Sequence, residues 1–136
     1  MKKRLIIIIL VVLIVAAAAT VYFTVIKKPP EKIHSYYVPG DYFVTNVKDS
    51  PALIKTTIVL EVYVYEKDLE DVTAYLTENN HIIRDLIVFK LRSKTEEELR
   101  AQDAADTLRK EIVESINKRM NIDYVSSVYF NDYVIQ

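Results

Sequence analysis

"VSSVYFNDYVIQ", residues 125–136, is the last stretch of the chain and has the alternating pattern of a β-strand. Two sets of side chains fall on opposite sides of such a strand: Val128, Phe130 and Val134 on one, and Tyr129, Asn131 and Tyr133 on the other. This period of two is typical of a strand with one buried face. A strand at a terminus is stable only when it is paired in a sheet. We therefore expect it to close a folded domain, with Gln136 at the domain's edge.

Two further strands are predicted upstream, at "DYFVTNV" (residues 41–47) and "LIKTTIVLEVYVY" (residues 53–65). Alternate residues of the longer strand are almost all apolar or β-branched, as a buried face requires. These residues are Ile54, Thr56, Ile58, Leu60, Val62 and Val64. The opposite face mixes Val59, Tyr63 and Tyr65 with charged and hydroxyl side chains. We expect that second face to be partly solvated or to contact a partner.

Three helices are predicted between the second strand and the last one. Asp68 is placed to cap the first, which carries Leu69, Val72, Tyr75 and Leu76 on one stripe. The second lies in "NNHIIRDLIVFKLRSK" (residues 79–94), where Ile82, Ile83, Leu86, Ile87 and Leu91 have helical spacing. Its "LIVF" alone also fits a buried strand.

The third helix is predicted to begin at a capping box formed by Thr95 and Glu98. One side of it carries Leu99, Ala104, Ala105, Leu108, Ile112, Ile116 and Met120. The resulting order over residues 41–136 is β–β–α–α–α–β. This order predicts an α+β domain in which a small sheet has helices packed on one face.

The N-terminus predicts a membrane helix. Residues 1–4 include three basic side chains, and residues 5–26 follow without a charge. Twenty-two helical residues span about 33 Å, enough for a hydrocarbon core of about 30 Å. Such a helix would place Leu5, Leu10, Val15, Ala19 and Ile26 within the membrane.

A cleaved signal peptide is the other interpretation of this segment. Its apolar core would be Leu5–Val15, and the run Ala16–Ala19 would supply a cleavage site. The apolar stretch continues beyond these alanines to Ile26, however, which favours an uncleaved anchor.

The flanking charges favour one orientation of the anchor. Lys2, Lys3 and Arg4 precede the span, whereas Lys27 and Lys28 follow it. The positive-inside rule then predicts a cytoplasmic N-terminus and an extracytoplasmic C-terminal domain. The absence of cysteine fits either compartment.

A short linker is predicted at residues 27–40, between the span and the domain. Pro29, Pro30 and Pro39 stiffen it, so that it would hold the domain within about 40 Å of the membrane. Residues 29–136 contain 13 Lys/Arg and 19 Asp/Glu, a net charge of −6. A domain this acidic is not expected to bind nucleic acid or anionic lipid headgroups.

The residues needed for catalysis or cofactor binding are sparse. Gly40 is the one glycine in the chain, so a phosphate-binding glycine loop is excluded. His34 and His81 are 47 residues apart and no cysteine accompanies them, so we expect neither a metal site nor a cofactor. No nucleophile elbow is present. These observations predict a protein that is not an enzyme.

Five stretches of the chain together resemble the FliL family of bacterial flagellar basal-body proteins. They are "DYFVTNVKD" (41–49), "TTIVLEVY" (56–63), "IIRDLIVFKLRSKTEEEL" (82–99), "LRKEIVESIN" (108–117) and "VYFNDYVIQ" (128–136). Their order and spacing carry the resemblance. It implies a single-pass protein of the inner (cytoplasmic) membrane with a periplasmic, stomatin-like (SPFH-like) outer domain, located at the basal body of the flagellum.

The resemblance also implies a role in motility without catalysis: assembly around the flagellar stator, in support of its engagement and torque. The implied partners are other copies of the chain in a ring and the stator subunits. We expect Val59, Tyr63, Tyr65, Arg84 and Asp85 to contribute to such an interface. A membrane-anchored extracytoplasmic domain that senses or binds a small ligand is the alternative function.

Overall fold

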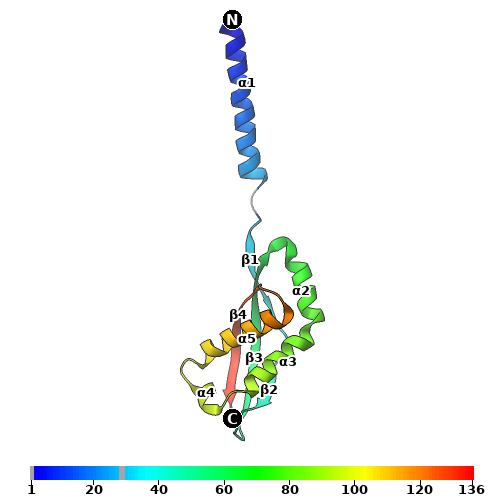
Figure 1. The fold of residues 1–136 in the computed structure, drawn as a ribbon, viewed down its shortest axis with the longest axis vertical. Helices are drawn as coiled ribbons and strands as arrows, with labels where there is room; N and C mark the ends of the chain where they lie inside the picture. Colours follow the sequence, from blue (N-terminus) through cyan, green and yellow to red (C-terminus); the bar gives the residue numbers. More distant parts are fainter. Residues whose placement is uncertain (1, 28–29) are drawn as a thin grey trace. The chain divides into compact units, whose positions relative to one another are not determined.

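The computed structural model describes residues 2–27 and 30–136, which form two compact units divided between Glu31 and Lys32 (Figure 1). The first unit is the helix α1 (Lys2–Val21), which continues into a π-helical turn, η1 (Tyr22–Ile26). Its length and apolar composition suit a membrane span. The hydroxyl of Thr20 donates to the Ala16 carbonyl (3.0 Å) and that of Thr24 to the Thr20 carbonyl (2.7 Å). Both polar side chains are therefore satisfied within the helix, as an apolar environment demands.

The second unit is built on one antiparallel sheet. Its strands are β1 (Lys32–Tyr37), β2 (Phe43–Asn46), β3 (Leu53–Tyr65) and β4 (Val125–Ile135). All three other strands pair with β3. Since β4 follows one edge of β3 from Ile54 to Val62, β1 and β2 lie one after the other along its opposite edge.

The strand β1 corrects the expected element order. Residues 27–40 were expected to form a linker, but Lys32–Tyr37 pairs with Leu60–Tyr65 of β3. This segment, "KIHSYY", lacks the aliphatic face that identifies β3, and its strand conformation depends on the pairing. Only residues 27–31 therefore separate η1 from the sheet.

The helices are α2 (Leu69–Glu78), α3 (Asn80–Arg92), α4 (Glu96–Arg100) and α5 (Ala104–Met120), with a 3₁₀ turn, η2 (Glu66–Asp68), before α2. Asp68 occupies the N-cap position of α2 as expected, but its side chain makes no capping hydrogen bond. The predicted capping box of Thr95 and Glu98 is present at α4.

The expected third helix is two helices, α4 and α5, because Ala101 has an extended backbone. Residues five apart in an uninterrupted helix point about 140° away from each other. The break lets Leu99 and Ala104, which are five apart, both face the core.

The core lies between the sheet and the helices. All six residues predicted for the buried face of β3 are buried. Four of them share one hydrophobic cluster with residues of α3 and α5: Ile54, Ile58, Leu60 and Val62 with Ile83, Ile87 and Leu91 of α3 and Leu108, Ile112 and Ile116 of α5. Burying each of these aliphatic side chains contributes about 1.5–3 kcal/mol to folding. The alternate residues of β3, on its other face, are half-buried or exposed.

A β-bulge at Asn131 reverses which side chains of β4 face the core after that residue. Thr57 pairs with Asp132 and Ile58 with Phe130, so Asn131 has no partner in β3. The expected alternation put Val134 on the side of Val128 and Phe130. Beyond the bulge, Val134 is instead 47% exposed. Tyr133 turns inward, and its hydroxyl donates to the Leu99 carbonyl (2.8 Å).

Candidate interaction surface

The sheet face opposite the core carries a cluster of aromatic side chains, which we call the tyrosine face. Register places His34 opposite Tyr63, Lys32 opposite Tyr65, and Tyr129 opposite Val59 on this face. The face consists of Lys32, His34, Tyr36, Tyr63, Tyr65 and Tyr129. Its four tyrosines are exposed, Tyr36 to 63%. Tyrosine combines large apolar area with a polar end, which suits it to protein interfaces.

Contacts within the tyrosine face hold its side chains in place. The rings of His34 and Tyr63 are 4.7 Å apart, and those of Tyr36 and Tyr129 are 6.2 Å apart. The Lys32 Nζ atom lies 5.3 Å from the ring centroids of both Tyr63 and Tyr65. Cation–π contacts at exposed sites contribute about 0.5–1 kcal/mol each. The surface is therefore partly ordered before any partner binds.

Glu61 is the carboxylate that lies among these residues. Its side chain is 13% exposed, and its Oε1 atom lies 3.0 Å from Nδ1 of His34. The hydroxyl of Ser126 donates to its Oε2 atom (3.2 Å). The charge of Glu61 is thus engaged inside the domain, whereas Lys32 presents its charge to solvent.

The predicted interface residues of β3 lie on this side of the sheet. Tyr63 and Tyr65 belong to the tyrosine face, and Val59 is half-buried between its strands. Contact with a partner remains a prediction for all three. Sequence reasoning missed Tyr36 and Tyr129, which reach the same surface through register with β3. The expected alternation of the closing strand did place Tyr129 on the side away from the core, so the sequence contained a signal for this residue.

The other two predicted residues, Arg84 and Asp85, point in different directions from α3. Arg84 contacts the loop between β1 and β2: its guanidinium donates to the carbonyls of Pro39 (2.9 Å) and Tyr42 (3.4 Å). Its Cζ atom lies 4.5 Å from the ring centroid of Phe43. Asp85 is exposed, and among the described residues it makes no hydrogen bond or ion pair.

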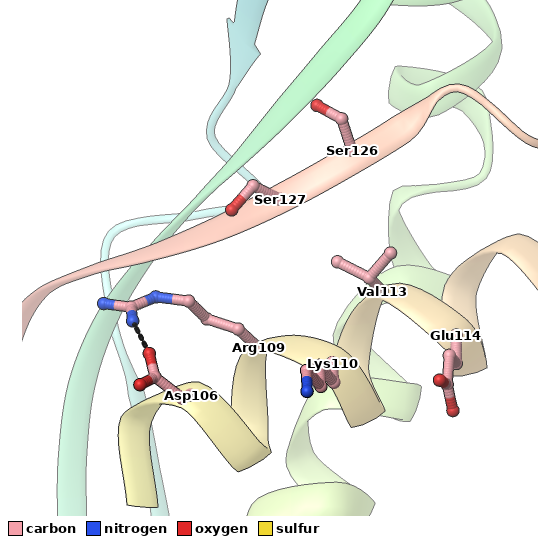
Figure 2. A pocket seen from close by; sticks show the side chains of 7 residues that line it. All are labelled: Asp106, Arg109, Lys110, Val113, Glu114, Ser126 and Ser127. Carbon is pink, nitrogen blue, oxygen red and sulfur yellow. Dashed lines mark hydrogen bonds and ion pairs between the residues drawn. The ribbon is translucent and has the colours of Figure 1, made fainter. Parts of the chain in front are cut away.

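A groove of about 440 Å³ lies between α5 and β4 (Figure 2). Its lining mixes both charges with two serines: Asp106, Arg109, Lys110, Val113, Glu114, Ser126 and Ser127. The Arg109 guanidinium bonds Asp106 (2.6 Å), and its Nε atom donates to the Val128 carbonyl (3.0 Å). This arginine therefore binds the outer edge of β4.

The Asn117 side chain covers another part of the same edge. Its Nδ2 atom donates to the Val125 carbonyl (2.9 Å), and its Oδ1 atom accepts from the Val125 amide (3.3 Å). One side-chain amide thus takes the place of a neighbouring strand at Val125.

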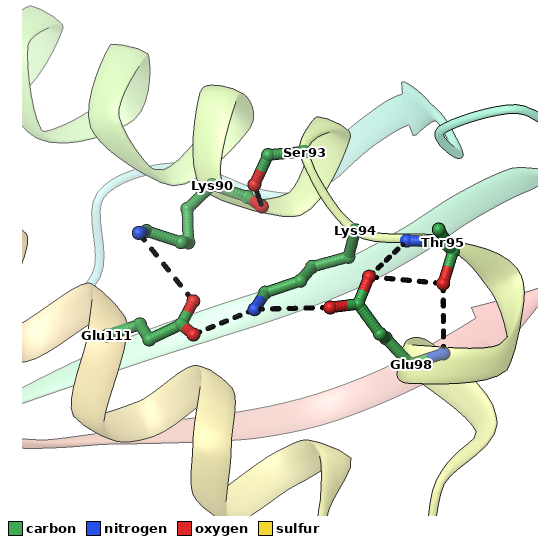
Figure 3. Close-up of polar contacts among 6 residues, drawn as sticks. All are labelled: Lys90, Ser93, Lys94, Thr95, Glu98 and Glu111. Atoms are coloured by element: carbon green, nitrogen blue, oxygen red, sulfur yellow. Dashed lines mark hydrogen bonds and ion pairs between the residues drawn. The ribbon is translucent and has the colours of Figure 1, made fainter.

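A second polar cluster joins the end of α3 to α4 and α5 (Figure 3). Lys94, 15% exposed, lies 2.7 Å from Glu111 and 3.9 Å from Glu98. Lys90 lies 3.6 Å from the same Glu111. The Thr95 backbone N–H, and then its hydroxyl, hold the pKa of Glu98 below its ordinary value. These contacts join three helices, so a structural role explains the cluster.

Other titratable groups also have structural partners. The Ser50 hydroxyl, followed by Arg100, holds the pKa of Glu96 below its ordinary value. Burial raises the pKa of Tyr133. Across residues 2–27 and 30–136, no group of three or more His, Asp or Glu side chains is arranged to hold a metal ion.

Residues 36–136, which include most of the sheet and all of its covering helices, match the model of a protein family described as flagellar basal body-associated protein FliL. The chain belongs to the FliL family. It is also similar to a protein named flagellar protein FliL from Aquifex aeolicus (strain VF5), with 29% identity over 94 residues. That match covers 69% of this chain and 56% of the relative, so the chain corresponds to little more than half of the relative's length. The description of this family associates its members with the flagellar basal body.

Proposed function

We propose that this FliL-family protein is a non-enzymatic scaffold of the flagellar motor. In this proposal, copies of the chain assemble into a ring around the stator and support its engagement and torque generation. The observation that carries the proposal is a FliL domain with an exposed, partly ordered tyrosine face, preceded closely by a helix fit to span a membrane. A stomatin-like arrangement of the domain is part of the same proposal.

The proposed location is the inner membrane, crossed once by α1. The basic residues before the span favour a cytoplasmic N-terminus and a periplasmic or otherwise extracytoplasmic domain. Tyr22 and Phe23 near the end of the apolar stretch suit the interfacial zone, where aromatic side chains anchor membrane helices.

The short connection after η1 supports assembly within one layer. Residues 27–31 extend to no more than about 18 Å, at roughly 3.5 Å per residue, so the reach is less than half of the expected 40 Å. Copies confined to a thin layer have a raised effective concentration, and contacts too weak to form in dilute solution then become populated.

The described polar groups support a scaffold better than a catalyst. The ion pairs and shifted carboxylates join helices, cap α4 or hold side chains on the sheet. A scaffold that supports torque generation must bind its partners and be held near them. In this proposal the tyrosine face provides the binding surface, and the membrane helix holds the domain in place.

Deletion of the gene tests the proposal. We expect the deletion strain to build filaments of normal number and length but to swim or swarm more slowly, with lower torque per motor. The wild-type gene should restore both. As a matched control, a strain without a stator subunit should have normal filaments and no rotation.

Two results would overturn the proposed function. One is wild-type motility and torque in the deletion strain at every load. The other is full-length protein that stays monomeric at high density in membranes, with or without the stator, by sedimentation and cross-linking. Loss of response to a small ligand with unchanged torque would favour the ligand-binding alternative.

A further inference from the structure

The outer side of α3 carries an exposed aromatic residue that the domain's own packing leaves unused. Phe89 is 60% exposed, and Asp85 lies one helical turn before it. Both residues are two positions from the buried Ile87, which places them about 160° around the helix from the core. We call these two residues the α3 patch. Aromatic side chains such as that of Phe89 are enriched at protein interfaces relative to the rest of the surface.

We propose that the α3 patch of one copy of the chain binds the tyrosine face of the next copy. This inference rests on the proposed self-assembly, and it names the two surfaces that form the contact. Phe89 would pack among the tyrosine rings while Asp85 pairs with Lys32.

Charge complementarity favours this occupant. Asp85 gives the α3 patch a negative charge, whereas Lys32 and the neighbouring Lys67 give the tyrosine face a positive one. Within the described part of the chain, none of these three residues forms an ion pair. Copies with a net charge of −6 over residues 29–136 repel each other in general. A contact that joins opposite local charges offsets this repulsion and sets one orientation.

The spacing of the groups on the two surfaces agrees. Side chains one helical turn apart are separated by about 5–6 Å at their Cβ atoms. On the tyrosine face, the Lys32 Nζ atom lies 5.3 Å from the ring centroids of Tyr63 and Tyr65. The spacing of Asp85 and Phe89 on α3 is therefore similar to the spacing of Lys32 and the tyrosine rings that they would contact. Edge-to-face contacts between rings would strengthen such an interface beyond the area that it buries.

The placement of the two surfaces makes the contact head to tail. The tyrosine face is the sheet face opposite the core, and α3 packs on the core side with its patch directed away from the sheet. A contact between two different surfaces leaves one of each free on the pair, so further copies add until a ring closes. Pairing of two tyrosine faces would instead stop at a dimer and bring lysines of both copies together.

The absence of cysteine allows a sharp test by cross-linking. Full-length Lys32→Cys and Asp85→Cys variants, carrying different tags, are co-expressed, and isolated membranes are treated with a short bis-maleimide. We expect a cross-linked product that carries both tags, and little product when either variant is expressed alone. A chain that carries both substitutions should give a ladder of cross-linked oligomers. Glu114→Cys, which replaces an exposed carboxylate on α5, is the matched control and should not link to Lys32→Cys.

The role of Phe89 is tested in the same assay. Because its ring is exposed, Phe89→Ser should leave the domain folded, as circular dichroism would verify, and lower the yield of mixed cross-link by at least about tenfold. An unchanged yield would overturn the anchor role of Phe89.

The remaining outcomes separate this inference from the proposed function. Self-linking of Lys32→Cys as strong as the mixed product would show tyrosine faces in contact with each other, and would overturn the inference. The inference would also be overturned if no mixed cross-link formed although wild-type protein sedimented as high-order species. In that case the proposed scaffold function would be retained. Wild-type protein that remains monomeric in membranes would overturn both.

Discussion

Arg84 and Pro39 are 45 residues apart in the chain, yet Nη1 of Arg84 donates a 2.9 Å hydrogen bond to the Pro39 carbonyl. The residue after Pro39 is Gly40, the one glycine of the chain, with φ of +144°. A Cβ atom at Gly40 would collide with Nη1 of Arg84. An arginine from α3 therefore closes the loop between β1 and β2, and a side chain at position 40 would have to displace its guanidinium.

We predict that Gly40→Ala destabilises the domain by about 1–3 kcal/mol, because alanine is strained at this φ and its methyl group displaces the guanidinium. Guanidinium chloride unfolding of the full-length protein in detergent, followed by circular dichroism, measures the effect. Asp41→Ala, an exposed neighbour in the same loop, serves as the control and should change stability by less than about 0.5 kcal/mol. Equal stability of Gly40→Ala and wild type would contradict the prediction.

Arg84 and Asp85 should respond differently to substitution. Arg84→Ala removes hydrogen bonds from a charged donor and leaves the loop carbonyls without it, so we expect a loss of about 2 kcal/mol in the free energy of unfolding. Asp85→Lys should leave that free energy within about 0.5 kcal/mol of wild type, because the side chain is exposed. It should nonetheless weaken self-association in sedimentation experiments. The same unfolding midpoint for both variants would contradict this division of roles.

The cap of α4 should contribute an acid-sensitive part of stability. The pKa of Glu98 is lower in the folded protein than its ordinary value of 4.5, chiefly through the Thr95 backbone N–H. The ionised carboxylate therefore stabilises the fold above that value, and the contribution is lost as pH falls through the lower, folded pKa. We expect the difference in Tm between wild type and Glu98→Gln to be largest near about pH 7 and to shrink by about pH 3. Glu97→Gln, which alters an exposed residue of the same turn, should show little difference at either pH.

Two valines of β4 test the bulge at Asn131. Val128 is fully buried, so Val128→Ala should cost about 2 kcal/mol in stability. Val134→Ala should cost less than about 0.5 kcal/mol, because the bulge turns this side chain to solvent. Chemical unfolding of both variants gives the comparison. Similar losses at the two positions would favour uninterrupted alternation along the strand.

The N-terminal helix should persist in the mature protein. We expect mass spectrometry of membrane-extracted protein to recover peptides that precede Ala16, since the apolar stretch continues to Ile26. A mature N-terminus at or near Thr20 would show that the segment is a cleaved signal peptide.

Where one pattern dominates locally, the sequence was sufficient to predict the structure. The bounds of β3, Leu53–Tyr65, coincide with the prediction because thirteen residues alternate without interruption. The capping box of α4 was also predictable, since its partners are three residues apart. By contrast, β1 is a strand only through its pairing with β3, and nothing in "KIHSYY" by itself separates it from a linker.

The candidate surface was predictable only in part, for the same reason. Alternation along β3 identified Tyr63 and Tyr65 as facing away from the core. The tyrosines that join them, Tyr36 and Tyr129, come from neighbouring strands and are placed by register, which depends on tertiary pairing. The exposure of Phe89 was hidden inside the apolar run "LIVF", because this run alone also fits a buried strand, in which Phe89 would be covered.

The protected edge of β4 bears on how such a protein avoids aggregation. An edge strand exposes unpaired backbone groups, and these can recruit strands from other molecules without limit. Many anchored copies in one membrane would make such recruitment a serious hazard. Arg109 and Asn117 occupy backbone groups of Val128 and Val125 on that edge. Disordered, fibre-like growth is thereby disfavoured at high density, and crowding in the membrane remains compatible with reversible exchange of subunits.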